Sequence, residues 1–414
     1  MAKRKLKSKV KFIFAFMIII AIAIIAFFKL NKNLEFDVSN ITKIIGKKET
    51  WPKVSTVSLV ATGDGLLHNP IYKAAYNKET DTYDFREMLS EVKDIISKYD
   101  IAYYNQETLF GGRQIERFGT EENGFSSYPY FNTPSEFGDA MVDIGFNTVS
   151  LVSNHSLDCT YNTEDCVQKT YKYWENKKIV FDGLNDPNVD GNKHNIGEVK
   201  GIKYGFLNYS NTFNGIDRFM NGLEDYFDVY DEEKVAKEVA ELKEKVDVVI
   251  VAMHWHKNSG EYSFVPTASN KAIANYLDSL GVDIILGTYS HCLQPFDVLE
   301  NGAVVFYSLG NFISNQLDLN AYGNYHPYVG AIGALANMDI TKTEYEDGTV
   351  DININNIGAD LLYSWHDKNY KTYKVIPFSK MNSSYNSNYK DIYNEYSSYL
   401  TNLNKNIKIA PVNE

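Results

Sequence analysis

The sequence has 414 residues, 44% of them hydrophobic and 23% charged, which is the composition of an ordinary globular protein. Its first 33 residues carry eight basic side chains and no acidic one, so the rest of the chain holds 33 basic against 53 acidic residues, a formal charge of −20. This acidity argues against nucleic-acid binding, because contacts with phosphates need a basic surface.

An apolar run of 17 residues, FIFAFMIIIAIAIIAFF at positions 12–28, follows the basic segment 1–11. Its length lies at the lower end of the roughly 17–25 residues of membrane-spanning helices, and Lys11 and Lys29 can extend their ammonium groups to the two interfaces. We therefore expect a transmembrane helix over residues 12–29. Because the positive charges precede it, we expect the N-terminus in the cytoplasm and the main domain outside the cell.

The same segment has a second interpretation, as a cleaved signal peptide. Residues 21–23, Ala-Ile-Ala, resemble a cleavage site, but the apolar run continues past them and no lipid-acceptor cysteine lies nearby. We favour an uncleaved anchor. Residues 30–54 then form a polar linker, and the chain is a single-pass protein of the cell membrane.

Apolar runs alternate with helical stretches between residues 55 and 315. Strands are expected at Val57–Ala61, Ile101–Tyr104, Thr148–Val152, Ile179–Phe181, Val248–Met253, Ile284–Leu286 and Val304–Tyr307. Helices are expected at Phe85–Lys98, Ser135–Ile144, Thr163–Asn176, Glu232–Lys245 and Ala268–Leu280. This alternation predicts an α/β fold, and strands that are apolar throughout indicate burial on both faces of a sheet.

Residues 316–414 have a different pattern. The alternating stretches Ile332–Ile340 and Val350–Ile357 predict antiparallel strands that extend or flank a sheet. The segment Ser383–Asn404 is rich in Ser, Asn and Tyr and is expected to form at most a loose helix. We therefore treat this part as a β-rich extension with a polar tail.

The chain has three cysteines, Cys159, Cys166 and Cys292, and none has the spacing of a zinc finger. Export from the cell would permit a disulfide between Cys159 and Cys166. Sequence alone does not show whether the two approach closely enough, so buried free thiols remain the alternative.

Five of the expected strands end in polar residues of the kind that bind metals. These are Asp64, Asn105 with Glu107, Asn154 with His155, His254, and His291. In open α/β sheets, ligands bind at the carboxyl ends of the strands, where the loops converge. A mixed set of carboxylate, amide and imidazole groups suits manganese, iron or zinc. The sequence thus predicts a divalent-metal site at this edge.

Each residue has a simpler interpretation by itself. Asp64 can cap a helix, Asn154 and His155 can form a surface turn, and His254 can be a buried imidazole whose hydrogen bonds are satisfied. A metal site is predicted only because all five strand ends carry such residues together.

Six segments resemble the capsule-biosynthesis (CapA, poly-γ-glutamate) family, in that family's order. They are VATGDGLLH at 60–68, IAYYNQETLFGG at 101–112, FNTVSLVSNHSLD at 146–158, VVIVAMHWHKNSGEY at 248–262, DIILGTYSHCLQPF at 283–296 and VFYSLGNFI at 305–313. The resemblance covers residues 55–315. It implies a four-layer α/β/β/α sandwich of the calcineurin-like metallophosphoesterase type, with the site at one edge of two stacked sheets.

The resemblance also implies roles for single residues. The metal-site positions are Asp64, Glu107, Asn154, His254 and His291, and His155 matches the histidine that assists catalysis. Asn105 and Asp158 would orient ligands. His68 and Glu261 would lie near the mouth, and the segment 307–311, which ends in Asn311, would support the site from a neighbouring strand.

The chain departs from the family pattern at three points. The Asp-x-His of the wider superfamily is Asp64-Gly65-Leu66 here, and Tyr289 replaces a histidine two residues before His291. A His-Trp-Gly has become His-Trp-His, which adds His256 near the site. These changes favour one ion, or a weakly bound pair, of manganese, zinc or iron.

The resemblance implies a role in making, exporting or anchoring an anionic capsule polymer such as poly-γ-glutamate, beside membrane-bound capsule synthases. The chemistry stays open between a metal-dependent hydrolase and a non-catalytic assembly or polymer-binding factor. A phosphoesterase unrelated to capsule, and an anchored domain without metal, are further alternatives.

Overall fold

The computed structural model describes Ile22 and residues 50–114, 122–189, 194–255, 261–316 and 326–413. Residues Lys53–Glu414 form one compact unit, and Met1–Pro52 form another. Among the residues described, none of the helices has both the length and the apolarity to cross a membrane. The apolar run 12–28 lies outside the described residues except for Ile22, so the anchor stays a prediction.

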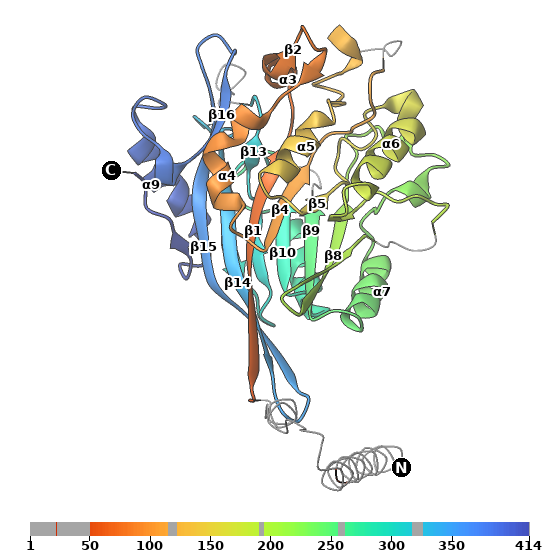
Figure 1. The fold of residues 1–414 in the computed structure, drawn as a ribbon, viewed down its shortest axis with the longest axis vertical. Coiled ribbons are helices and arrows are strands. Elements are labelled where there is room, and N and C mark those ends of the chain that lie inside the picture. Colours follow the sequence, from red (N-terminus) through yellow and green to blue (C-terminus); the bar gives the residue numbers. More distant parts are fainter. Residues whose placement is uncertain are drawn as a thin grey trace, which may run out of the picture. The chain divides into compact units, whose positions relative to one another are not determined.

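The first sheet contains nine strands among the described residues (Figure 1). Its order is β16-β15-β14-β1-β4-β5-β6, with β13 pairing with β1 and β17 with β15. The strands are β1 (Lys53–Gly65), β4 (Ile101–Gln106), β5 (Thr148–Ser150), β6 (Val180–Asp182), β13 (Asn311–Ile313), β14 (Ile332–Glu344), β15 (Val350–His366), β16 (Tyr373–Pro377) and β17 (Lys408–Ile409). Strands β1, β4, β5 and β6 are parallel, so their carboxyl ends share one edge.

The second sheet has six strands in the described part of the chain, in the order β11-β12-β10-β9-β8-β7. They are β7 (Ile196–Val199), β8 (Ile202–Ser210), β9 (Val248–His254), β10 (Ile284–Thr288), β11 (Phe296–Val298) and β12 (Val304–Phe306). Strands β8, β9, β10 and β12 are parallel. A small separate hairpin joins β2 (Tyr76–Asn77) and β3 (Thr82–Tyr83).

The helices precede or follow the strands in the predicted α/β alternation. They are α3 (Asn69–Ala75), α4 (Ser90–Ile96), α5 (Glu136–Asp143), α6 (Thr163–Glu175), α7 (Glu232–Lys243), α8 (Ala268–Ser279) and α9 (Tyr389–Leu400). Helix α7 shows why such segments form helices. The Asp231 side chain accepts a hydrogen bond from the backbone N–H of Lys234 at its N-terminus, and Val235, Val239 and Leu242 recur on one buried face.

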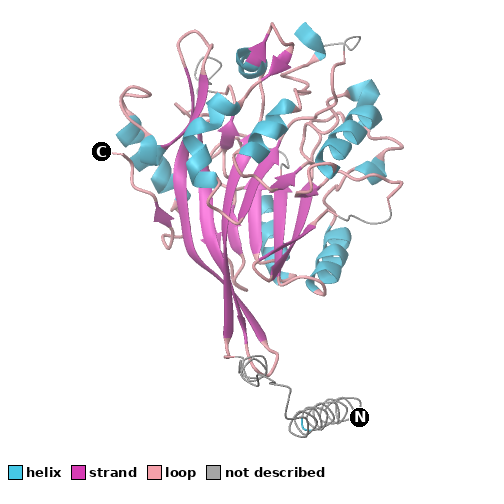
Figure 2. Ribbon diagram, in the orientation of Figure 1, coloured by secondary structure: helices cyan, strands magenta, loops and turns pink. Residues whose placement is uncertain are grey.

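Three hydrophobic clusters define the layers (Figure 2). One lies between helices α3–α6 and the first sheet, and another between the outer face of the second sheet and helices α7 and α8. The third lies between the sheets, where the rings of Tyr103 and Phe206 are 5.6 Å apart. Alternate residues of β9 enter different clusters, Val249 and Val251 outward and Ile250 inward. Burial of both strand faces explains the uninterrupted apolar sequence.

The mixed α/β fold is confirmed, and the expected strands and helices of residues 55–315 occur with shifted ends. The expected helix Phe85–Lys98 is split into a short 3-10 turn, Arg86–Leu89, and α4. Strands β7 and β8 were not expected from the sequence, and they occupy one edge of the second sheet.

The C-terminal strands belong to the main sheet. Strand β14 pairs antiparallel with β1 from Lys53↔Glu344 to Ala61↔Ala336, and β15 continues the sheet beyond it. Antiparallel pairing was expected for these strands, and β14 lies directly beside β1, the strand that carries Asp64. The polar segment around residues 383–404 contains a regular helix, α9, which buries Tyr396 and Leu400.

Cys159 and Cys166 form a disulfide, with 6.3 Å between their Cα atoms. Of the two alternatives left open by the sequence, the structure has the bonded one. The pair joins the turn after His155 to the start of α6. Cys292 is free and buried.

Asp360, on β15, gives a testable pH dependence of stability. Burial raises the pKa of its carboxyl to about 6, although hydrogen bonds from Ser379 oppose this shift. The folded protein therefore binds more protons than the unfolded chain between about pH 4 and about pH 6, and stability falls as the pH rises through this window. Across this window the free energy of unfolding decreases by about 3 kcal/mol.

Replacement of this residue should remove that pH dependence. In Asp360→Asn, the side-chain oxygen can still accept from the Ser379 amide and the new NH₂ can donate to its hydroxyl. We expect the variant to gain about 2 kcal/mol relative to wild type on going from about pH 4 to about pH 7. Urea unfolding at both pH values measures this, and an equal response of both proteins would contradict it.

Candidate metal centre

The strand ends of both sheets converge on one buried group of polar side chains. Asp64 lies near the end of β1, Glu107 follows β4, Asn154 follows β5, His254 ends β9 and His291 follows β10. All five are at most 4% exposed. The structure therefore brings together the five residues that were expected from the sequence to bind a metal, and direct contacts connect them.

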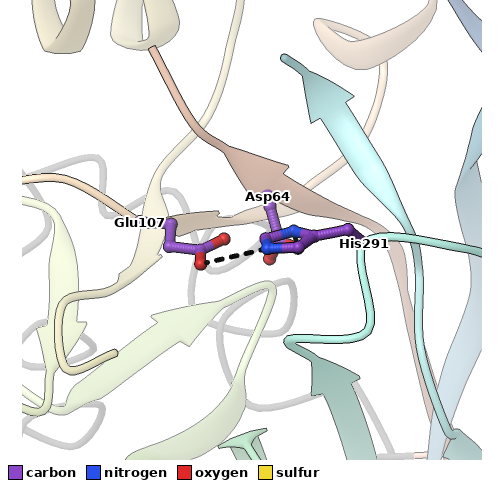
Figure 3. Close-up of side chains that lie close together, drawn as sticks. All are labelled: Asp64, Glu107 and His291. Atoms are coloured by element: carbon purple, nitrogen blue, oxygen red, sulfur yellow. Dashed lines mark hydrogen bonds and ion pairs between the residues drawn. The ribbon is translucent and has the colours of Figure 1, made fainter. Parts of the chain in front are cut away.

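Three of these residues form the tightest group. One potential ligand atom each of Asp64, Glu107 and His291 lies within 4.8 Å of the other two (Figure 3). Figure 3 shows the Glu107 carboxylate and the His291 ring facing one another, with Asp64 beside them. Two carboxylates and an imidazole from three separate strand ends are a ligand set suited to zinc, manganese or iron.

The surroundings of Glu107 indicate whether this group could bind a cation. Its side chain is fully buried, and neither carboxylate oxygen accepts a hydrogen bond from any described residue. Its Oε1 lies 3.7 Å from Nε2 of His254, 3.7 Å from Nε2 of His291 and 3.8 Å from Nε2 of His155. Ligand atoms about 2.1 Å from one ion are roughly 3 to 3.5 Å apart. The arrangement fits a divalent ion after small adjustments.

The electrostatics of Glu107 also favour a bound cation. Burial raises the pKa of the Glu107 carboxyl well above its ordinary value, and Asp64 adds to this while His291 opposes it. A buried carboxylate without hydrogen-bond donors is costly, and a bound cation would remove that cost. Glu107 therefore provides the clearest indication of a metal in the site.

His291 is oriented by its Nδ1 atom. This atom lies 3.2 Å from both Asp64 Oδ2 and Asn311 Oδ1, two acceptors that favour a proton on Nδ1 and leave Nε2 toward Glu107. Burial alone would lower the pKa of His291, but Glu107 and Asp64 outweigh it and raise the pKa to about 10. Asn311 thus contacts His291 from β13.

Asn154 and His254 form the other half of the group. His254 Nε2 lies 2.9 Å from Asn154 Oδ1, and its Nδ1 lies 2.9 Å from the Thr288 hydroxyl. The amide NH₂ of Asn154 donates to Asn214, which directs its carbonyl oxygen toward His254. His254 Nε2 also lies 3.7 Å from Glu107 Oε1, so this pair adjoins the same carboxylate as His291.

Asn105 holds the carboxylate of Asp64 in place. Its NH₂ donates a 2.8 Å hydrogen bond to Asp64 Oδ1, and the Ser150 hydroxyl donates to its carbonyl oxygen at 2.6 Å. These two bonds fix the orientation of the Asn105 amide, with its NH₂ toward Asp64 and its oxygen toward Ser150. Asp64 is therefore held through Oδ1, and its Oδ2 faces His291.

His155 is held by Asp158. The two side chains meet at 2.7 Å between His155 Nδ1 and Asp158 Oδ2, and the same oxygen accepts from the Phe131 backbone N–H at 2.5 Å. A carboxylate at Nδ1 leaves His155 Nε2 directed toward Glu107. The pair has the arrangement of a histidine oriented for proton transfer beside the metal group.

The predicted mouth residues occupy different positions. His68 packs edge-on against Phe131, with ring centroids 5.0 Å apart, and burial lowers the pKa of His68 to about 3. Glu261 is exposed and close enough to affect Glu107 and His291 electrostatically. Tyr289 packs against His254 and His291. The predicted contribution of His256 concerns a residue outside the described part of the chain.

Two glycines allow the backbones to cross beside Asp64. A Cβ atom on Gly63 would lie 1.7 Å from the Gly310 carbonyl oxygen, and that oxygen accepts a hydrogen bond from the Asp64 backbone N–H. Gly310 has a φ of +65°, which glycine adopts without strain. This close approach places Asn311 next to Asp64 and His291.

Several supporting residues were not predicted. Phe131 and Asn214 come from loops whose sequences carry no periodic signal, so only the folded chain shows their contacts with Asp158 and Asn154. Thr288 and Ser150 are different, because each is the last residue of a strand, three or four residues before a predicted ligand. A search for hydroxyl groups at those positions could have found them.

The family model described as bacterial capsule synthesis protein PGA_cap matches residues 58–316. The chain belongs to this family. The match contains both members of the His155–Asp158 pair and all five residues at the strand ends, namely Asp64, Glu107, Asn154, His254 and His291. The resemblance to the capsule-biosynthesis family is thus confirmed.

Two curated relatives are capsule proteins of Bacillus species. The chain is 26% identical to the PGA biosynthesis protein CapA of Bacillus subtilis over 279 residues, which are 66% of this chain and 68% of that protein. It is 27% identical to the capsule biosynthesis protein CapA of Bacillus anthracis over 191 residues, 45% of this chain and 44% of that protein.

Similar solved structures include a phosphatase from Mycoplasma pneumoniae, with 14% identity and a TM-score of 0.40 over 77% of this chain and 97% of that one. A calcineurin-like phosphoesterase from Bacillus subtilis has 14% identity and a TM-score of 0.38 over 84% of this chain and 99% of that one.

Proposed function

We propose that this capsule-synthesis protein is a divalent-metal-dependent hydrolase that acts on the capsule polymer. The supporting observation is the Glu107 carboxylate, buried without a hydrogen-bond donor and surrounded by three imidazole nitrogens at 3.7 to 3.8 Å. A purely structural role would leave two buried oxygens unsatisfied, whereas a cation satisfies both. The oriented His155 beside it adds a group for proton transfer.

The residues of the site would have separate roles in the reaction. Asp64, Glu107 and His291 would hold the ion, and the neighbouring Asn154 and His254 could contribute further ligand atoms. A divalent ion supplies Lewis acidity and a bound water whose pKa is lowered toward ~7. Asp158 keeps the Nδ1 proton of His155 in place, so that Nε2 can give a proton to the leaving group. Burial of the whole group strengthens each of these interactions.

The family match supports the choice of substrate class. One curated relative carries poly-γ-glutamate (PGA) biosynthesis in its name, so we propose an amide bond of poly-γ-glutamate or of a similar anionic polymer as the bond cleaved. An acidic domain needs local positive charge to accept such a chain, and the ion provides it. The apolar run 12–28 would anchor the domain on the outer face of the membrane, beside a membrane-bound synthase.

Elemental analysis of the purified protein tests the metal assignment. We expect about one equivalent of zinc, manganese or iron in wild type, and loss of most of it in Asp64→Ala and in His291→Ala, because each removes one of three charged or imidazole ligands. Asp347→Ala is the matched control, since Asp347 lies in the exposed turn between β14 and β15.

Three outcomes decide the assignment. Metal in wild type and in the control, but not in the two site variants, supports it. Absence of metal from wild type after exposure to all three ions overturns the metal assignment and the hydrolase with it. Bound metal without cleavage of poly-γ-glutamate, while deletion of residues 53–414 still abolishes capsule, would replace the hydrolase by a polymer-binding assembly factor.

A further inference from the structure

A groove of about 780 Å³ lies on the surface between two loops. One wall is formed by residues 160–165, which begin a few positions after His155 and include the first turn of α6. The other wall belongs to the loop between β8 and α7 and contains Arg218 and Phe219. The first of these loops therefore also carries the residue proposed for proton transfer.

The second loop connects the groove to the metal centre. Its Asn214 accepts a 3.1 Å hydrogen bond from the NH₂ of Asn154, and Arg218 follows Asn214 by four positions. Four residues of extended chain span at most about 14 Å, so the backbone of Arg218 lies within that distance of the backbone of Asn214. A chain molecule bound at Arg218 can therefore extend to the metal centre.

Arg218 is the basic residue of this groove, and none of the described carboxylates forms an ion pair with it. The other two arginines in the described part of the chain, Arg86 and Arg113, are paired with aspartates at 2.6 Å and 2.8 Å. Arg218 is exposed, and its guanidinium lies over the ring of Phe219, 4.8 Å from the centroid. Stacking on one face leaves the N–H groups at the edge of the guanidinium available for an oxygen ligand.

The two acidic side chains of the groove are engaged by other groups. Asp165 forms an ion pair with Lys169 at 2.7 Å. Glu164 accepts hydrogen bonds from the Tyr226 hydroxyl at 2.9 Å and from the Gln168 NH₂ at 3.2 Å. These contacts offset the negative charge of the groove and leave Arg218 as its available charged group.

An aromatic pair forms the surface beside Arg218. Tyr161 is 90% exposed, and its ring stands edge-on to the ring of Phe219 with centroids 5.1 Å apart. A γ-linked glutamate polymer carries a free carboxylate and two methylene groups in each unit. A guanidinium next to exposed aromatic rings matches both features, because it can bind the carboxylate while the rings cover the methylene groups.

We propose that Arg218, with Tyr161 and Phe219, forms a subsite that binds a free carboxylate of the capsule polymer and positions the chain across the metal centre. This inference rests on the proposed function, from which it takes the anionic polymer as substrate. It adds the residue that recognises the charge of that polymer away from the bond to be cleaved.

Binding of a fluorescently labelled poly-γ-glutamate oligomer to the full-length protein tests this inference, with the Kd measured by fluorescence anisotropy. In chelator the oligomer stays intact and no ion contributes. We expect the Kd to rise at least about tenfold in Arg218→Gln, because a charge-assisted hydrogen bond is lost. Arg218→Lys keeps the charge without the planar pair of donors and should give an intermediate Kd. Arg86→Gln is the matched control, since it removes the same charge from an arginine that is already paired.

Cleavage assays with zinc or manganese give a second measurement. Because Arg218 would contact the substrate away from the metal centre, Arg218→Gln should raise KM for the polymer and leave kcat and the metal content close to those of wild type. The rise in KM should shrink at high salt, which screens an exposed ionic contact.

The outcomes separate this inference from the proposed function. Weaker binding in Arg218→Gln but not in Arg86→Gln supports the subsite. Equal weakening in both variants overturns it, because only the overall charge then matters. An unchanged Kd in Arg218→Gln, while wild type cleaves the polymer, overturns the subsite and leaves the hydrolase intact. If wild type neither binds nor cleaves the oligomer, the proposed substrate fails together with the subsite. A neutral polysaccharide that binds wild type and Arg218→Gln equally well would assign the groove to sugar rings instead.

Discussion

His155→Ala should abolish turnover while the protein keeps its metal. General acid–base groups contribute about 10²- to 10⁴-fold to a rate, so we expect a loss in kcat of that size. His155 Nε2 lies 3.8 Å from Glu107, but His155 is not part of the group formed by Asp64, Glu107 and His291. Its removal therefore takes away the proton donor and leaves the charged ligands in place. Cleavage assays with poly-γ-glutamate and elemental analysis of the same samples measure both effects.

Asp158→Asn is the companion variant. The amide can still occupy the space near His155 Nδ1 and the Phe131 N–H, but it lacks the negative charge that stabilises a protonated ring. We expect a smaller loss in kcat than for His155→Ala, with the metal content unchanged. Because Asp158 acts through His155, Asp158→Asn should cause little further loss in kcat when His155→Ala is already present. Full turnover in His155→Ala would exclude the proposed role of His155.

The sequence predicts much of this fold because its strands are buried on both faces. An uninterrupted apolar run rich in β-branched residues, such as Val248–Met253, favours a central strand, and the structure has β9 there with every residue buried. Strand β8 was missed because its sequence, IKYGFLNYS, contains a lysine, a glycine and an asparagine within a strand whose neighbours cover it. Its Asn208 caps the loop after β5 by accepting from two backbone amides, a tertiary contact without local signal.

The candidate site was predictable to the extent that it follows from strand ends. Parallel strands carry their carboxyl ends to one edge, so Asp64 and Glu107, at the ends of the neighbouring strands β1 and β4, had to approach one another once the first sheet formed. The sequence could not show the hydrogen bond from Asn154 to Asn214 or the packing of the Tyr289 ring against His254 and His291. Both are consequences of side-chain packing between elements far apart in the chain.

Glu107→Gln should uncouple the stability of the protein from its metal. An ion that binds only the folded state at 100 times its Kd stabilises that state by about 2.7 kcal/mol. The variant loses the charge that attracts the ion and replaces one ligand oxygen by an NH₂ group. If its Kd rises roughly 100-fold, the same ion concentration contributes only about 0.4 kcal/mol. Unfolding of both proteins in chelator and in excess zinc or manganese measures the difference.

Unfolding of wild type and Glu107→Gln in chelator measures the free-energy cost of the buried Glu107 charge when no ion is bound. Without an ion, wild type must protonate or desolvate Glu107, since neither oxygen accepts a hydrogen bond from a described residue. The glutamine variant avoids that cost and should be at least as stable. Glu261→Gln removes an exposed charge beside the same site and should keep the full response to metal. If chelator destabilises Glu107→Gln as much as wild type, the ion that stabilises this fold binds somewhere else, because a ligand cannot lose its charge without weakening its own site.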